Sequence, residues 1–216
     1  MNIYETFYER QNKTNSGTPD VFFYDRIPNK LRVQIIHISK ESIGDINSFE
    51  GIYNDEYENV KYSYDIIVDT LRKEFWVFNL NKSSNFNRKQ KELFQFILEN
   101  TDVGKVLSAI ELICRIIENR VSQYDYRYDS QSEIVSKSAI AEINIRMKAS
   151  GLGFEYNKEI IRIDTELLHV ETVQPALKLL QDARYAGPEQ EFRTAYKHYQ
   201  NGNHKEAITE AAKSFE

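Results

Sequence analysis

The fold depends on the stretch VGKVLSAIELICRIIENRVS, residues 103–122, which carries the most regular apolar pattern of the chain. Its apolar side chains recur at alternating spacings of four and three, which place them on one face of an α-helix. They are Val103, Leu107, Ile110, Cys114, Ile117 and Val121, with Val106 and Ile113 widening the face. We therefore predict a central core helix from Val103 to Ser122.

Further amphipathic helices are predicted on both sides of this core helix, separated by turn-forming residues. They cover residues 1–11, 28–44, 55–76, 87–99, 131–149, 171–182, 189–199 and 205–216. Two short apolar runs, Phe154–Tyr156 and Ile160–Ile163, predict a β-hairpin joined through Asn157 and Lys158. The predicted fold class is mainly α: a helical bundle with one small β-hairpin (residues 154–163) and a C-terminal helical hairpin.

The composition is that of an ordinary globular protein, with 41% apolar and 28% charged residues among 216. A net charge of -5 does not indicate a protein that coats nucleic acid by bulk charge. The chain has no apolar leader and no run of about 18 apolar residues, so we expect no membrane partner. Cys114 is the only cysteine, which excludes an internal disulfide and favours a reducing, cytoplasmic compartment.

The sequence contains no phosphate-binding loop, no G-x-S-x-G or H-E-x-x-H motif and no kinase signature. His37 and His169 have no cysteine, histidine or carboxylate partner at metal-ligand spacing, so we expect structural roles for both. Cys114 lies on the apolar face of the core helix, where a buried small side chain is favoured over a catalytic thiol. We therefore predict no metal and no cofactor.

The stretch RTAYKH places Arg193 and His198 on one predicted helix, with four residues between them. Such a pair can stabilise a phosphate beside a general base, which suits metal-independent RNA cleavage at the 2′-hydroxyl. Five positions of a helix rotate the side chains about 140° apart, so the pair converges poorly within one copy. Arg193 and His198 are the candidate catalytic residues, and two solvated polar side chains are the alternative.

A tyrosine-rich stretch, YDYRYD at residues 124–129, also has two interpretations. Tyrosine and arginine side chains can stack on exposed bases. However, Asp125 and Asp129 flank the single Arg127, and this excess of acid disfavours phosphate. We therefore favour a solvated connector with its rings tucked underneath.

Several stretches together resemble a bacterial abortive-infection family, in which an AbiJ-like N-terminal domain precedes a HEPN-type domain. They are FYERQNK, DRIPNKLRVQIIHI, AIAEINIRMKASGLGFEYNKEIIRIDTELLHVETVQPALKLL and EFRTAYKHYQNGNHKEAITEAAKSFE. The resemblance implies an AbiJ-like helical domain over residues 1–180. It also implies that residues 189–216 are the first two helices of a truncated HEPN-like bundle. HEPN ribonucleases share an arginine followed after four to six residues by a histidine, on a later helix than the one that carries Arg193 and His198. The resemblance therefore implies that the full-length protein is a metal-independent ribonuclease whose active site lies outside residues 1–216.

Two functions from different classes follow. The first is an anti-phage abortive-infection protein, with an N-terminal sensor or regulatory domain and a HEPN-type domain that cleaves RNA. The second is a non-enzymatic module that binds nucleic acid or protein, in which the helix and hairpin of residues 131–164 contact the partner. In both, the apolar face of the last helix predicts a homo-oligomer formed through residues 189–216. The last two helices also match one tetratricopeptide hairpin, but a stable array needs about three units.

Overall fold

A computed structural model describes residues 22–49, 54–81, 88–163, 174–180, 185–200 and 203–214. The chain divides into two compact units, residues 1–161 and 162–216, and we describe each by itself. The helix predicted for residues 1–11 and His169 lie outside the described residues.

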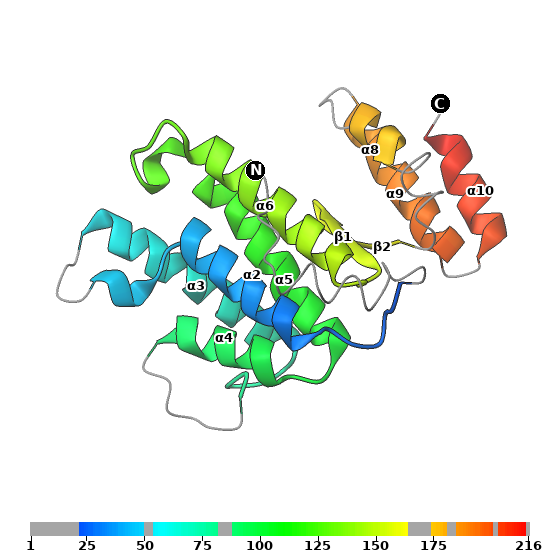
Figure 1. The fold of residues 1–216 in the computed structure, drawn as a ribbon. Coiled ribbons are helices and arrows are strands. Elements are labelled where there is room, and N and C mark those ends of the chain that lie inside the picture. The colour runs from blue at the N-terminus through cyan, green and yellow to red at the C-terminus, as the bar shows by residue number, and fades with distance from the viewer. Residues whose placement is uncertain are drawn as a thin grey trace, which may run out of the picture. The chain divides into compact units, whose positions relative to one another are not determined.

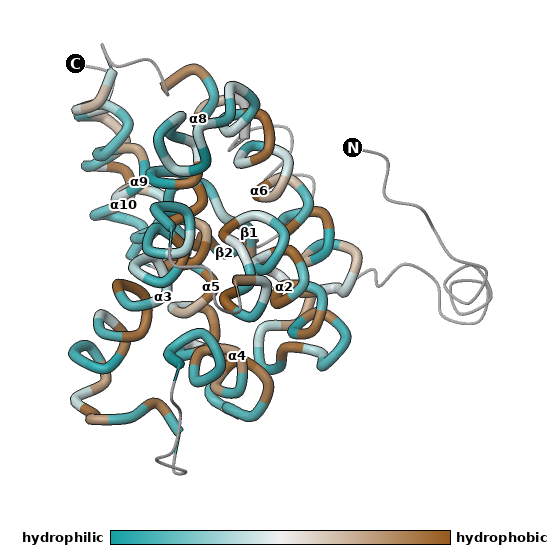
Figure 2. The backbone as a smooth tube through the Cα atoms, turned by 90° about the vertical axis from the view of Figure 1, so that its left-hand side faces the viewer, coloured by the Kyte–Doolittle hydropathy of each residue, from teal (hydrophilic) through white to brown (hydrophobic). Residues whose placement is uncertain are grey.

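The first unit is a helical bundle with one two-stranded sheet, which confirms the predicted fold class (Figure 1). Its longer helices are α2 (Asn29–Ser42), α3 (Asp55–Glu74), α4 (Lys89–Glu99), α5 (Val103–Ile116) and α6 (Ser132–Ala149). Its short elements are η1 (Ile46–Phe49), η2 (Ile117–Val121), η3 (Tyr124–Tyr126), β1 (Phe154–Asn157) and β2 (Glu159–Arg162), the last ending at the boundary of the unit. Figure 2 shows hydrophobic and hydrophilic residues alternating along the helices, as expected when each buries one face.

Helix α5 is the central element, as the apolar pattern predicts. Ile110, Ile113 and Cys114 are fully buried in one core that also takes side chains from α2, α3, α4 and α6. The predicted single helix ends earlier, however, because residues 117–121 form a π-helical turn in which the Ser122 N–H donates to the Ile117 carbonyl (3.2 Å). Such single π-turns interrupt α-helices and recur at functional sites.

Capping residues explain where α3 and α5 begin. The Asn54 side chain accepts from the Tyr57 N–H (2.9 Å), and the Asp102 carboxylate accepts from the Lys105 N–H (3.1 Å). Each satisfies a backbone donor that the first helical turn leaves unpaired. Beyond the end of α2, Gly44 has a φ of 124°, which favours glycine.

A buried arginine joins α2 to the end of α4. Arg32 donates through Nε to the Ile27 carbonyl (2.9 Å) and through one terminal nitrogen to the carbonyls of Ile97 (2.5 Å) and Asn100 (2.8 Å). The last carbonyls of a helix have no partner within it and attract cations. Arg32 thus closes α4 and fixes its position against α2.

The apolar pattern of residues 131–149 takes Ile134, Ala141, Ile145 and Met147 as apolar positions of α6, and it is wrong in part. Met147 is buried, but Ile134 and Ile145 are exposed, and the other buried positions include Ser136 and Ile143. Ser136 can be buried because its hydroxyl donates to the Ile117 carbonyl (2.6 Å), in the π-turn.

The predicted hairpin is present, with its turn at Lys158, whose φ is 59°. The Asn144 side chain in α6 pairs with both the N–H and the carbonyl of Tyr156 (2.8 Å each). The Tyr156 hydroxyl also donates to the Glu118 carboxylate in the π-turn (2.7 Å). These bonds fasten β1 to the helical body.

The second unit contains α8 (Gln174–Leu180), α9 (Ala186–Gln200) and α10 (His204–Lys213). Helices α9 and α10 pack as a hairpin, which confirms the predicted C-terminal helical hairpin. Ala195 of α9 and Ala207 of α10 are their buried apolar side chains. Among the described residues, no helix is long and apolar enough to cross a membrane.

Candidate functional site

Arg193 and His198 both lie on α9, as predicted, but the structure does not join them. Arg193 donates through Nε (3.1 Å) and a terminal nitrogen (3.0 Å) to one carboxylate oxygen of Glu189, one turn earlier. The two side chains are only 12% and 10% exposed, respectively. His198 is half-buried in the last turn of α9, and no hydrogen bond or ion pair of the described structure links it to Arg193.

This ion pair limits the chemistry that Arg193 can perform. The Glu189 carboxylate occupies the guanidinium edge that a phosphate oxygen would otherwise take. A phosphate would have to displace Glu189 before Arg193 could stabilise it. The catalytic role of Arg193 and His198 therefore stays a prediction, and the geometry of α9 gives it no direct support.

A second candidate site surrounds the π-turn and the stretch 124–129, and we call it the tyrosine surface. It consists of the exposed Tyr62, Tyr124 and Tyr128 with Arg120. The Arg120 guanidinium lies over the Tyr62 ring (4.8 Å to its centre), and the rings of Tyr124 and Tyr128 meet edge to face with centres 6.2 Å apart. The expectation that all rings of this stretch are tucked underneath is therefore wrong for Tyr124 and Tyr128.

Tyr126 is the ring of this stretch that is buried. Its hydroxyl donates to the Ile43 carbonyl (3.0 Å) and lies 3.2 Å from the Ser63 hydroxyl. Burial raises the pKa of Tyr126, so its hydroxyl remains a hydrogen-bond donor. Tyr126 thus anchors the loop that displays its two neighbours.

The charges of the tyrosine surface favour stacking over phosphate binding. Asp125 and Asp129 are exposed, and the Arg127 Nε lies 3.7 Å from the Glu56 carboxylate. Acidic groups therefore offset the arginines. This surface can stack on an aromatic group, but it lacks the excess of cations that a nucleic-acid backbone requires.

The β-hairpin is also a poor candidate for contacting nucleic acid as the wing of a winged-helix domain does. Its tip carries Lys158 beside Glu159, so it has no excess of positive charge. Tyr156 is held inward by Glu118, and burial, followed by the Glu118 carboxylate, raises the pKa of the Tyr156 hydroxyl. The hairpin therefore has a structural role, because Tyr156 joins it to the π-turn through Glu118.

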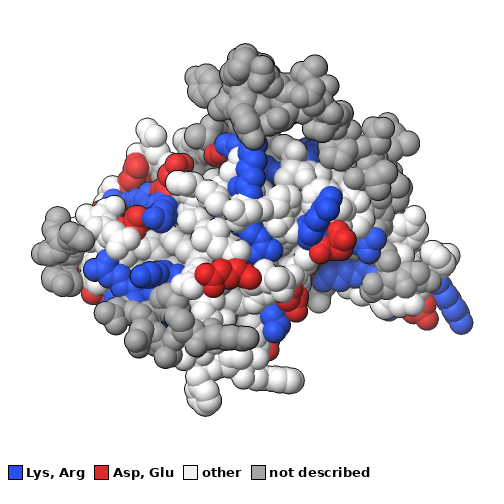
Figure 3. All heavy atoms as spheres, turned by 60° about the horizontal axis from the view of Figure 1, so that its bottom comes forward, with Lys and Arg blue, Asp and Glu red and all other residues white. Residues whose placement is uncertain are grey.

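A groove of about 750 Å³ lies between the end of α2 and one face of α4. Phe94 and Leu98 form its apolar wall, and Lys40, Arg88 and Lys91 contribute cations. Lys40 is paired with Asp45 (2.9 Å), whereas Arg88 and Lys91 form no ion pair within the described part of the chain. Figure 3 shows basic and acidic side chains intermixed over this side of the molecule, with no large field of one sign.

Neither metal nor thiol chemistry gains support from the described residues. No group of three or more histidine, cysteine or carboxylate side chains that could hold a metal occurs among them. Cys114 is fully buried, and burial raises the pKa of its thiol. Since the thiolate is the reactive form, the structure agrees with a packing role for Cys114.

The comparison with protein families decides the classification. The model of AbiJ N-terminal domain 4 matches residues 5–178. The chain belongs to this family. Membership of the AbiJ N-terminal domain 4 family connects the protein with abortive infection, a defence against phage. No curated protein and no solved structure was found to match the chain.

Proposed function

We propose that the chain is the sensor or regulatory part of an anti-phage abortive-infection protein that acts on RNA through a HEPN-type domain. Residues 1–180 form the AbiJ-like part, and residues 189–216 begin the HEPN-like bundle. The observation that carries the proposal is the family match over residues 5–178. The single cysteine supports a cytoplasmic location.

Exposed apolar side chains of the second unit support packing against further helices, either of the same protein or of a second copy. Ile208 and Leu179 are exposed, although both are large apolar side chains. Helices that pack on such side chains, from the same protein or a second copy, would remove them from water. We therefore propose a homo-oligomer formed through residues 189–216. Phe215, which the apolar pattern also places on this surface, lies outside the described residues.

A non-enzymatic binding module is the second candidate function. The Arg193–Glu189 ion pair favours it, because this pair leaves the candidate catalytic arginine neutralised. The tyrosine surface supports a module that recognises exposed bases or aromatic groups of a protein by stacking. This alternative requires no reaction.

RNA integrity in cells separates the two functions. Expression of the full-length protein is expected to slow growth and to fragment RNA, and loss of both effects in an Arg193→Ala, His198→Ala variant would assign the cleavage to these two residues. His204→Ala is the matched control, because His204 is an exposed histidine on the neighbouring helix α10. Intact RNA and unchanged growth with the full-length protein would exclude the nuclease and leave the binding module.

A further inference from the structure

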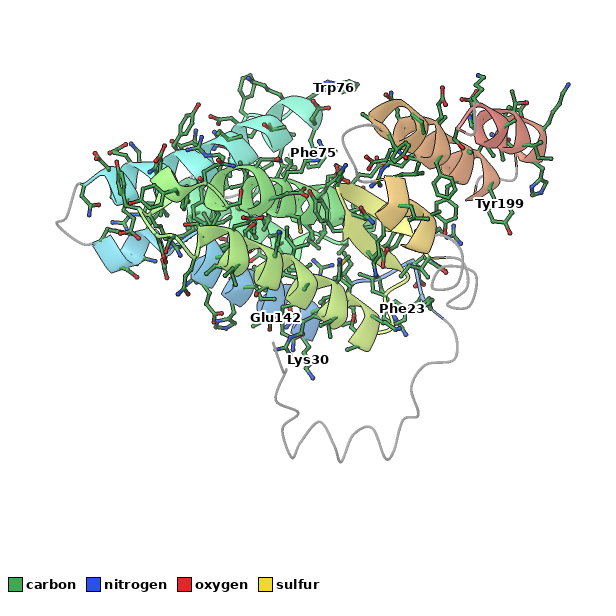
Figure 4. The ribbon with its side chains drawn as sticks, turned by 90° about the horizontal axis from the view of Figure 1, so that it is seen from above. Phe23, Lys30, Phe75, Trp76, Glu142 and Tyr199 are labelled. Atoms are coloured by element: carbon green, nitrogen blue, oxygen red, sulfur yellow. The ribbon has the colours of Figure 1, made fainter. Side chains whose placement is uncertain are left out.

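The end of α3 displays two aromatic side chains that no part of the first unit covers. We call residues Trp76–Phe78 the aromatic tip. Trp76 is 93% exposed and Phe78 is 95% exposed, with Val77 partly exposed between them. Figure 4 shows Trp76 beyond the end of α3. Trp76 is also the only tryptophan of the chain.

The backbone at Trp76 would favour glycine. Its φ is 56°, and the N–H groups of Trp76 and Val77 donate to the carbonyls of Lys73 (3.2 Å) and Arg72 (2.9 Å). This is the Schellman ending, in which glycine normally occupies the left-handed position. Helix α6 ends with the same two bonds, and there the left-handed residue is Gly151, with a φ of 77°.

Trp76 therefore occupies a strained position without gaining buried area. A bulky side chain in this conformation is a genuine outlier, and such outliers cluster at functional sites. Since the side chain stabilises neither α3 nor the core, its presence indicates a contact outside the first unit.

The segment that follows the tip is held in place. The Glu92 carboxylate of α4 accepts from the Leu80 N–H (2.7 Å) and from Arg72 (2.6 Å). The Asn81 side chain donates to the Glu92 carbonyl (2.8 Å). A fixed segment loses little conformational freedom on binding, which favours association.

The groove between α2 and α4 has the chemistry to receive such a tip. Phe94 and Leu98 offer an apolar wall, and two cations lie at the same groove: Lys91 and Arg88, which donates a hydrogen bond to the Asn47 side chain (2.7 Å). Lysine and arginine are attracted to the face of an aromatic ring, and to that of tryptophan most strongly. The groove thus fits a protruding aromatic group flanked by apolar side chains.

We propose that the aromatic tip of one copy inserts into the α2–α4 groove of a second copy. The second copy is the occupant because the same chain carries both complementary surfaces. This interface is distinct from the one proposed for residues 189–216. The small area of the tip predicts a weak, concentration-dependent association rather than a permanent dimer.

Two variants, each with one intact surface, test the proposal. In the 216-residue chain, Trp76→Gly removes the tryptophan of the tip and keeps the groove, whereas Leu98→Glu disrupts the groove and keeps the tip. The Leu98→Glu variant retains the only tryptophan, so its emission reports this site alone. Adding the tryptophan-free Trp76→Gly variant is expected to shift that emission to shorter wavelength, saturating at one-to-one stoichiometry.

The control is a titration with the Trp76→Gly, Leu98→Glu double variant, which has neither surface and is expected to cause no shift. Sedimentation should show that each single variant associates less than the original chain, while their mixture forms a pair. Circular dichroism checks that both variants remain folded. An equal shift with the double variant, or no shift with either, would overturn the proposal.

Two further outcomes would also overturn it. An emission shift caused by single-stranded RNA or by phosphatidylcholine vesicles, without self-association, would assign the tip to a different partner. Self-association that Phe215→Asp abolishes and Trp76→Gly leaves unchanged would support residues 189–216 as the interface and exclude the tip. The two proposed interfaces can therefore fail separately.

Discussion

At position 76, glycine is expected to give a more stable protein than alanine, which reverses the usual order for a helix. The left-handed conformation costs an L-residue about 1–2 kcal/mol. The greater freedom of glycine in the unfolded chain offsets about 0.4–1 kcal/mol of this. Trp76→Gly should therefore exceed Trp76→Ala in unfolding free energy by about 0.5–1 kcal/mol. Because Trp76 is 93% exposed, either truncation removes little buried area.

Urea unfolding followed by circular dichroism measures this difference, and equal slopes for the variants make their midpoints comparable. Gly151→Ala is the mirror variant, since it places a side chain at the same position of the ending of α6, and it should be destabilising. His37 is exposed within α2 and provides the ordinary case, where alanine should be more stable than glycine by about 1 kcal/mol. A Trp76→Ala variant at least as stable as the Trp76→Gly variant would refute the backbone strain inferred at position 76.

Three other predictions concern the first unit. Arg32→Met should lower the unfolding free energy by about 2–3 kcal/mol, because it leaves helix-end carbonyls without their buried donor; urea unfolding measures the loss. Gly44→Ala should cost about 2 kcal/mol or more, because the new Cβ would lie 2.7 Å from a methyl group of Val60 and φ is 124°; a midpoint within error of the original would contradict this. Burial raises the pKa of the Cys114 thiol, so iodoacetamide should label this thiol at pH 8 only as the protein unfolds. Mass spectrometry measures the labelling, and rapid labelling of the native protein would count against burial of Cys114.

The apolar pattern predicted the helices because the side chains that each helix buries recur at regular spacings along the sequence. The pattern of α5 identified the core helix correctly, since its buried side chains are all apolar. It failed at α6 because the buried serine there is satisfied by a carbonyl of the π-turn, a contact that spacing alone does not reveal.

Local turn geometry limited the prediction of the site in the same way. In YDYRYD, the loop buries Tyr126 and exposes its two tyrosine neighbours. Tyr126 is buried because its hydroxyl donates to the carbonyl of Ile43, which is far away in the sequence. No glycine follows α3 in the sequence to indicate where the helix ends, so the left-handed backbone conformation of Trp76 could not be predicted. The Glu189–Arg193 pair was accessible to sequence reasoning, because opposite charges four positions apart on a helix commonly pair.

Phage challenge tests the central claim most directly. Bacteria that express the protein would be infected with a panel of phages, and plaque numbers and culture survival would be compared with those of cells carrying an empty vector. The assignment to abortive infection predicts fewer plaques for at least one phage, together with death or arrest of the infected cells before phage release. Unchanged plaque numbers and culture survival across the panel, with the protein expressed and folded, would contradict it.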